Sequence, residues 1–370
     1  MNAPTPETDR NMIAAEADEN GIVWYDVTGE PFDLYGFYDT KPFMRLPEDV
    51  AAATNPGVKR NNYHTAGGRV RFSTDSSRIC VRAEMPYVTK YVHMPMTGSS
   101  SFDLYVDTEY GSKYRACYKP DVHIKDGFTG EIKLPKTEKT VYYTMNFPLY
   151  SPVTKLEIGI DAGSVLGHGM KYLPVLPVVY YGSSITQGAC ASRPGLCYES
   201  IISRRLNIDH INLGFSGNAL AEDTIVDYMK TIKMSCFVSD YDHNAPNPEH
   251  LKATHLKMYK AIREAQPDIP YIMLSKPDFI FHEIGSSLSG SDDAIKRRRI
   301  IEDTFRYARE NGDKNVWYID GDGICRGVDE DSCSVDSTHP NDIGFMKMAD
   351  AIGRIIRRAM RRGLAEKEED

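Results

Sequence analysis

The chain has 370 residues, of which 41% are hydrophobic and 26% are charged, a composition typical of folded globular proteins rather than disordered ones. Its formal net charge of −8 argues against a nucleic-acid partner, because proteins that bind phosphate backbones need a basic surface. The length exceeds that of one ordinary domain, so we expect two.

The N-terminal residues 1–20 are polar and acidic and contain no apolar run of the kind found in signal peptides. We therefore expect a disordered or loosely attached leader. No stretch of the sequence has the length and apolarity of a membrane span, so no membrane partner is expected. The seven cysteines are scattered without zinc-ligand spacing, which favours thiols in a reducing cytoplasm. These features predict a cytoplasmic protein without a metal or a cofactor.

Residues 21–173 contain short β-branched and aromatic runs, separated by Gly, Pro, Asn and Asp, and this pattern predicts an antiparallel β-sandwich domain. The expected strands include 70–72, 79–83, 102–106, 141–143 and 155–160. Several tyrosines in this region could stack on sugar rings, although packing between neighbouring strands is the commoner role of such side chains. They are Tyr87, Tyr91, Tyr110, Tyr114 and Tyr118.

Residues 174–363 change to an alternation of buried strands and amphipathic helices, which predicts a three-layer α/β/α domain with a parallel sheet. Strands are expected at 178–181, 210–213, 236–238, 272–274 and 316–319, and helices at 294–311 and 343–360. Basic runs such as 296–299 are expected to be solvated faces of these helices. Residues 364–370 are expected to form a polar tail.

Residues that could take part in catalysis follow four of the predicted parallel strands. Ser184 comes after the first strand, Gly217 after the second and Asn244 after the third, whereas Asp336 and His339 follow the fifth strand and a loop. Because ligands bind at the carboxyl ends of parallel strands, we expect these residues to meet at one edge of the sheet.

Their chemistry is complementary. A serine hydroxyl becomes nucleophilic when an imidazole removes its proton, and a carboxylate fixes the tautomer of that imidazole. Ser184, His339 and Asp336 could fill these three roles. The backbone N–H groups of Ser184 and Gly217 and the side-chain amide of Asn244 could stabilise an oxyanion, although Asn244 could instead cap the helix that begins near Pro248.

The ordered blocks around these residues resemble those of the SGNH/GDSL hydrolases over 178–362. The matching blocks are Gly-x-Ser-Ile-Thr at 182–186, Asn-x-Gly-x-x-Gly at 212–217, Asn244 and Asp-x-x-His at 336–339. This resemblance implies a flavodoxin-like parallel sheet, Ser184 as nucleophile, an acid–base pair of Asp336 and His339, and an oxyanion hole at Ser184, Gly217 and Asn244. Two blocks depart from the usual pattern, since Ser183 replaces the usual Asp and the third block reads Tyr-Asp-His-Asn.

With both departures, the chain resembles a subgroup whose N-terminal β-domain carries a Gly-x-Asp-Leu-Tyr signature. We expect this domain to be jelly-roll-like. Here that signature reads Ser-Phe-Asp-Leu-Tyr at 101–105. Further candidate substrate contacts are Arg193, which could instead form an ion pair within its loop, and Asp242 and His243, which could instead be surface residues.

The resemblance implies a serine esterase that cleaves small acyl esters, acetyl above all, from a small-molecule or oligosaccharide substrate. Two alternatives stay open at this point. One is an acyltransferase that passes the acyl group to a hydroxyl acceptor, and the other is a catalytically inactive carbohydrate-binding protein. Esterases of this kind often self-associate, so a homo-oligomer is compatible with the prediction.

Overall fold

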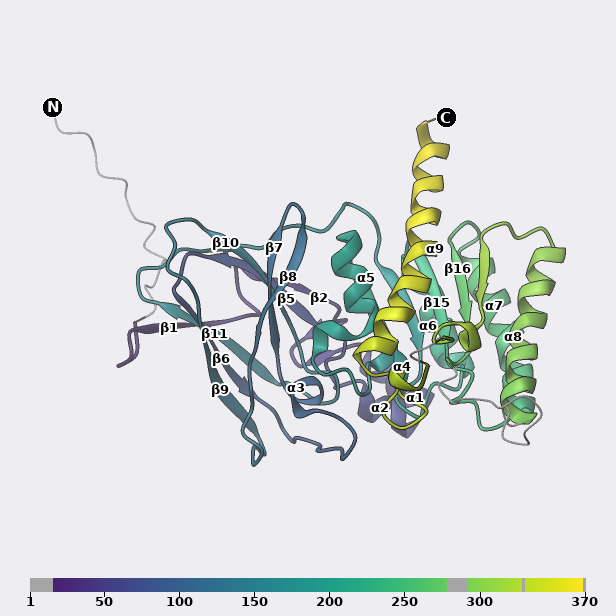
Figure 1. Ribbon diagram of the computed structural model, residues 1–370, viewed down its shortest axis with the longest axis horizontal. Helices are drawn as coiled ribbons and strands as arrows, with labels where there is room; N and C mark the ends of the chain where they lie inside the picture. Colours follow the sequence, from purple (N-terminus) through teal and green to yellow (C-terminus); the bar gives the residue numbers. More distant parts are fainter. Residues whose placement is uncertain (1–15, 278–291, 328–329, 369–370) are drawn as a thin grey trace.

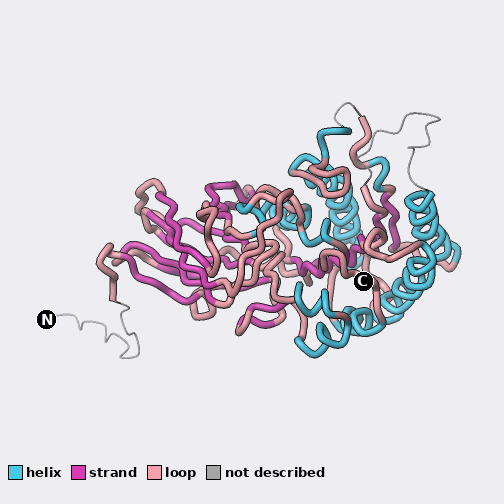
Figure 2. Tube along the Cα trace, turned by 90° about the horizontal axis from the view of Figure 1, so that it is seen from below, coloured by secondary structure: helices cyan, strands magenta, loops and turns pink. Residues whose placement is uncertain are grey.

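The computed structural model describes residues 16–277, 292–327 and 330–368. In Figure 1 the strands of the N-terminal half lie on one side and a mixed region of strands and helices on the other. The turned view of Figure 2 shows the same separation, with the long helices packed around the mixed region of strands and helices. Residues 1–15 of the expected leader lie outside the described residues. No helix in the described ranges combines the length and the apolarity needed to cross a membrane.

Two antiparallel sheets build the N-terminal region. The first has the strand order β1 (Ile22–Asp26), β11 (Lys155–Asp161), β6 (Arg78–Glu84) and β9 (Gly127–Lys133). The second has the order β12 (Leu166–His168), β5 (Arg69–Thr74), β10 (Val141–Asn146), β7 (Asp103–Thr108) and β8 (Gly111–Cys117), with β2 (Asp33–Tyr35) beside β5. Alternate side chains from both sheets, such as Phe72, Leu104 and Ile158, fill the core between them. The expected β-sandwich is confirmed.

Five parallel strands form the sheet of the C-terminal region, in the order β14 (His210–Gly214), β13 (Val178–Gly182), β15 (Cys236–Asp240), β16 (Tyr271–Leu274) and β17 (Val316–Ile319). Counted along the chain this order is 2-1-3-4-5, that of flavodoxin-like folds. The expected parallel sheet is therefore confirmed. In this order the switch point of the topology lies between β13 and β15, so residues that follow these two strands face the same crevice.

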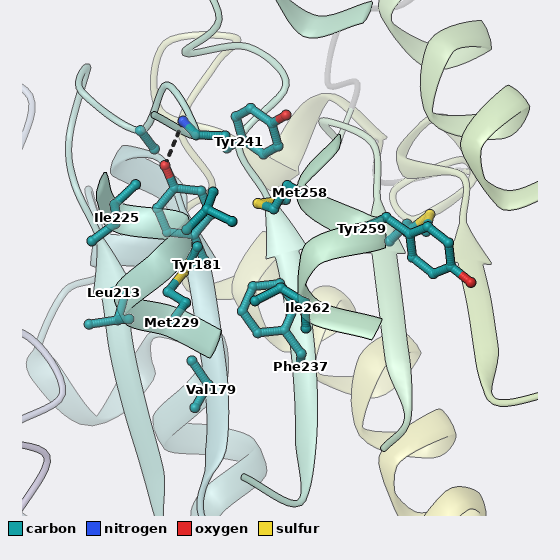
Figure 3. Packing of buried hydrophobic residues seen from close by; sticks show 14 of the residues in the cluster. Val179, Tyr181, Leu213, Ile225, Met229, Phe237, Tyr241, Met258, Tyr259 and Ile262 are labelled. Carbon is teal, nitrogen blue, oxygen red and sulfur yellow. Dashed lines mark hydrogen bonds between the residues drawn. The ribbon is translucent and has the colours of Figure 1, made fainter. Parts of the chain in front are cut away.

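Helices cover both faces of the parallel sheet. On one face lie α6 (Asp223–Thr231), α7 (Pro248–Ala265) and α8 (Asp292–Glu310), and on the other lie α5 (Tyr198–Leu206) and α9 (Asp342–Glu368). Figure 3 shows the first of these two cores, where Val179 and Tyr181 of β13 pack with Phe237 of β15 and Ile262 of α7. α9 continues through most of the segment expected to be a polar tail.

The two regions share a core. Two short helices of the N-terminal half, α1 (Glu48–Thr54) and α2 (Pro56–Asn61), place Ala51 and Val58 in the same apolar cluster as the parallel sheet. Next to them, Arg45 is buried and donates to the carbonyl oxygen of Gly214 at 2.7 Å. Burial lowers the pKa of Arg45 to about 9. A segment predicted to belong to the sandwich thus completes the hydrophobic core of the other region.

Candidate active site

Ser184 begins the four-residue helix α4 (Ser184–Gln187), directly after strand β13. The hydroxyl of Ser183 caps this helix by accepting from the N–H of Ile185 at 3.0 Å. A Cβ atom at Gly182 would lie 2.2 Å from the carbonyl oxygen of Asp240, so only glycine allows the chain to turn this close to the neighbouring strand. The strand end, the cap and the glycine together fix the Ser184 side chain at the carboxyl edge of the sheet.

His339 meets Ser184 from the other end of the C-terminal region. The Ser184 Oγ atom lies 2.9 Å from Nε2 of His339, and Nδ1 of the same ring lies 2.8 Å from Oδ2 of Asp336. Asp336 also accepts the backbone N–H of His339 at 2.8 Å through its other oxygen. Ser337 between them has φ +64°, which lets the chain turn tightly enough for the carboxylate to reach the ring three residues away. The structure therefore brings together the three residues expected to act on one another.

The surroundings of Asp336 and His339 shift the pKa values of both side chains. Partial burial opposes the charge of Asp336, but hydrogen bonds from the side chain and backbone of His339 outweigh burial and lower the pKa of Asp336 to about 2. For His339, burial lowers the pKa and outweighs the opposite influence of Asp336. A neutral imidazole beside an ionised carboxylate is the state that a general base requires.

The candidate oxyanion donors lie in the loops that follow β13, β14 and β15. Within the described part of the chain, the N–H groups of Ser184 and Gly217 and the Nδ2 group of Asn244 donate no hydrogen bond. Asn244 accepts the N–H of Ala219 through Oδ1 at 3.3 Å, which ties its amide to the turn that contains Gly217. The helix cap considered for Asn244 belongs to Asn247, whose Oδ1 accepts the N–H of His250 at 2.8 Å.

Gln187 and His64, neither of which was predicted from the sequence, hold the turn of Gly217 in place. The Oε1 atom of Gln187 accepts the N–H of Ser216 at 2.9 Å. Burial lowers the pKa of His64 to about 3, so its neutral ring accepts from Nε2 of Gln187 at 3.0 Å. Gly217 has φ +69°, a backbone conformation that suits glycine. A buried polar contact from the N-terminal half therefore supports a candidate oxyanion loop.

Asp242 and His243, the weaker candidates for substrate contact, lie beside Asn244 and are not surface residues. Asp242 is buried and accepts the N–H of Lys276 at 3.0 Å, and the His243 ring lies 3.2 Å from the same carboxylate. The guanidinium of Arg297 donates to the carbonyl oxygen of Ala245 at 2.8 Å. Arg297 is only 9% exposed, so the prediction of a solvated basic face at 296–299 was wrong for this residue. Its side chain faces inward, where its guanidinium donates to the carbonyl oxygens of Asp242 and Ala245 in the loop that follows β15.

Arg193, the other weaker candidate, faces the N-terminal sheet. Its guanidinium lies 3.4 Å from the carboxylate of Asp103 and stacks on the Tyr114 ring, with its central carbon 3.7 Å from the ring centre. Asp103 also accepts the N–H of Gly195 at 2.9 Å. Arg193 thus forms an ion pair, although with Asp103 of β7 and not within its own loop as considered, and the Asp of the N-terminal signature joins the two regions.

The N-terminal region also contributes His93, a neighbour of the site that was not predicted from the sequence. Its ring lies 5.5 Å from the ring of His339, centre to centre, and 6.0 Å from that of Tyr91. Tyr91 packs on Tyr150, whose hydroxyl donates to the carbonyl oxygen of Ser184 at 3.1 Å. By contrast, Tyr118, which follows β8, is a buried core residue of the sandwich, in keeping with the packing role considered for these tyrosines.

The 2-1-3-4-5 parallel sheet carries a serine, a histidine and an aspartate joined at its carboxyl edge, which is the arrangement that the resemblance to SGNH hydrolases implies. A model of the GDSL-like lipase/acylhydrolase family matches residues 176–357 of the chain, and a model of the N-terminus of SGNH-type esterases matches residues 22–166. The esterase or hydrolase class expected from the sequence is thus supported. No curated protein matches the chain in sequence.

Solved structures share this fold over most of the chain. A GDSL-like lipase from Bacteroides ovatus is 24% identical with a TM-score of 0.82, and the match covers 92% of this chain and 98% of that one. The salicylyl-acyltransferase SsfX3 from a tetracycline biosynthetic pathway is 18% identical with a TM-score of 0.70, covering 95% and 99%. An acetyl xylan esterase, Est2A, from the rumen bacterium Butyrivibrio proteoclasticus is 11% identical with a TM-score of 0.56, covering 92% and 98%.

Proposed function

We propose that this protein is a serine esterase that removes small acyl groups, acetyl above all, from the hydroxyl groups of carbohydrates. The observation that carries the proposal is the continuous hydrogen-bonded chain from Ser184 through His339 to Asp336. The same chain argues against an inactive binding protein, since a binding role requires no such alignment. The likeness in fold to Est2A supports an acetylated carbohydrate as substrate.

In the proposed reaction, Oγ of Ser184 attacks the ester carbonyl while Nε2 of His339 takes its proton. The oxyanion of the tetrahedral intermediate accepts from the N–H groups of Ser184 and Gly217 and from Nδ2 of Asn244. The intermediate collapses, the C–O bond to the alcohol breaks, and His339 returns the proton to the leaving alkoxide. Water, deprotonated by His339, then attacks the acyl-serine and releases the carboxylic acid and free Ser184.

The test compares p-nitrophenyl esters of increasing acyl length and acetylated xylo-oligosaccharides, with the Ser184→Ala variant beside the wild type. We expect acetyl esters to react fastest and the variant to lose nearly all turnover. An unchanged rate in Ser184→Ala would refute the proposed nucleophile. Equal rates for long and short acyl groups would refute the acetyl preference but leave the esterase intact.

Acyl transfer is the second candidate, favoured by the likeness in fold to SsfX3 and by the position of His93 beside His339. A residue from the N-terminal region at this place could help orient an acceptor hydroxyl and exclude water. Turnover of an acyl donor in the presence of candidate sugar and phenol acceptors distinguishes the two. A transferase gives mainly the new ester, whereas an esterase gives mainly the free acid.

A further inference from the structure

Three metal-binding side chains converge at the candidate active site from three separate parts of the chain. They are His93 from the N-terminal region, Cys190 from the loop after α4, and His339 from the loop before α9. One ligand atom from each residue lies within 4.8 Å of those of the other two. The proposed hydrolysis uses only His339 of the three, so the cluster has no explanation in that reaction.

The backbone holds Cys190 in this position. It has φ +70°, is 4% exposed and carries a free thiol. The next residues are anchored as well, since Ala191 donates to the carbonyl oxygen of Gly188 at 3.2 Å and Ser192 donates its N–H to Asp342 at 2.8 Å. Ligands that are already in place lose little conformational freedom when they bind an ion.

One thiol and two imidazoles form a ligand set that Zn²⁺ prefers, with a fourth tetrahedral position left for water. We propose that His93, Cys190 and His339 bind Zn²⁺ and that this ion reversibly inhibits the enzyme. Binding replaces the thiol proton, which is released to solvent, by a bond between Zn²⁺ and the thiolate. The ion also takes the lone pair of His339 Nε2, so His339 can no longer accept the proton of Ser184. The inhibition rests on the proposed function, whereas the binding does not.

The charges around the cluster favour a cation. Asp336, which holds the ring of His339 at 2.8 Å, is also near enough to Cys190 for its negative charge to act on the thiol. The carboxylate that opposes a thiolate attracts a divalent cation to the same place. The other titratable neighbour, His243, is near enough to affect the ionisation of His339.

The inhibition test titrates p-nitrophenyl acetate hydrolysis with Zn²⁺ in the wild type and in two matched variants, Cys190→Ser and Cys117→Ser. Cys117 is a free thiol in the N-terminal sheet and is more exposed than Cys190. We expect a chelator to restore the wild-type rate, Cys117→Ser to behave as the wild type, and Cys190→Ser to keep its basal rate. The half-inhibiting Zn²⁺ concentration should rise at least about tenfold in Cys190→Ser. Equal inhibition of Cys190→Ser and wild type would overturn the proposal.

A binding test separates this site from the proposed reaction. Co²⁺ is added to the Ser184→Ala protein, which needs no turnover, and the near-ultraviolet charge-transfer band of a cobalt–thiolate bond is recorded. We expect the band in Ser184→Ala and its loss when Cys190→Ser or His93→Ala is added. No band, or a band that persists without Cys190, would overturn the metal site even if the esterase is confirmed. If the band appears but no ester is hydrolysed, the proposed function fails and the metal site stands.

Discussion

At the scale of single residues, the ionisation of His339 determines when Ser184 can react. His339 must be neutral to accept the serine proton, and burial holds the pKa of this ring below its ordinary value of 6.5. The rate should therefore fall as the pH decreases through a value below 6.5, where the ring becomes protonated. Measurement of kcat/KM against pH with p-nitrophenyl acetate checks this, and an acidic limb centred clearly above 6.5 would contradict it.

Replacement of Asp336 by Asn tests the role of the carboxylate. The variant loses an interaction that raises the pKa of His339, so its acidic limb should move to lower pH. Its kcat should nevertheless fall roughly 10³- to 10⁴-fold, because an amide no longer fixes the required tautomer of the ring. A variant with wild-type kcat would show that Asp336 only caps the loop through the N–H groups of Thr338 and His339.

Asn244 and Asn247 form a matched pair for testing the oxyanion role. Asn244→Ala removes a candidate donor and should lower kcat about 10²- to 10³-fold with little change in stability. Asn247→Ala removes the cap of α7 and should cost about 1 kcal/mol of unfolding free energy with little change in kcat. Steady-state kinetics and thermal unfolding of both variants check this, and the reverse pattern would contradict the assignment.

The sequence was sufficient to predict which residues meet Ser184 when the strand order alone brings them together. Asp336 and His339 follow a strand of the same parallel sheet, and their spacing of three suits a turn. His93 could not be found in this way. It lies outside any strand, and its place beside His339 depends on how the two regions pack against each other.

At the scale of elements, the buried carboxylate of Asp103 on β7 connects the N-terminal sheet to the loop that follows α4. It accepts from Asn146 at 2.8 Å and from the N–H of Gly195 at 2.9 Å, and it pairs with Arg193. Asp103→Ala should lower the unfolding free energy by about 3–5 kcal/mol, because it removes the buried charge that pairs with Arg193 and the acceptor of the Asn146 amide and the Gly195 N–H. Chemical denaturation measures this loss.

Asp121→Ala is the control for Asp103, because Asp121 is exposed in the same region and should change the unfolding free energy little. A loss in Asp103→Ala no greater than that in the control would contradict the assigned role of Asp103.

Strands and helices were predicted best where the apolar pattern is compatible with only one kind of element in one layer of the fold. Four strands of the parallel sheet, β13, β15, β16 and β17, are apolar on both faces, whereas β14 carries His210 and Asn212 on one face; all five occur where expected. The role of α1 and α2 was not predicted. Their apolar residues, such as Ala51 and Val58, are few, and they pack on a sheet that lies far along the chain. The sequence pattern shows that such residues are buried but not which core receives them.

At the scale of the whole molecule, the shared core implies that the two regions depend on each other. The apolar side chains of Leu46 and Val58 lie in the cluster that covers one face of the parallel sheet. Each such buried side chain contributes about 1.5–3 kcal/mol. A fragment of residues 174–363, the predicted limits of the hydrolase domain, should therefore be less stable than the full chain and lack activity. Calorimetry and ester hydrolysis check this, and a fragment with full-length stability and rate would contradict it.

Localisation in the cytoplasm, self-association and the exact domain limits remain predictions. The central claim is that Ser184 carries the acyl group during turnover. Rapid acid quenching of the enzyme with p-nitrophenyl acetate, followed by peptide mass spectrometry, tests it most directly. We expect one acetyl group on the peptide that contains Ser184, and none on that peptide in Ser184→Ala. An acetyl group that accumulates on another residue of an active enzyme, or turnover that persists in Ser184→Ala, would contradict it.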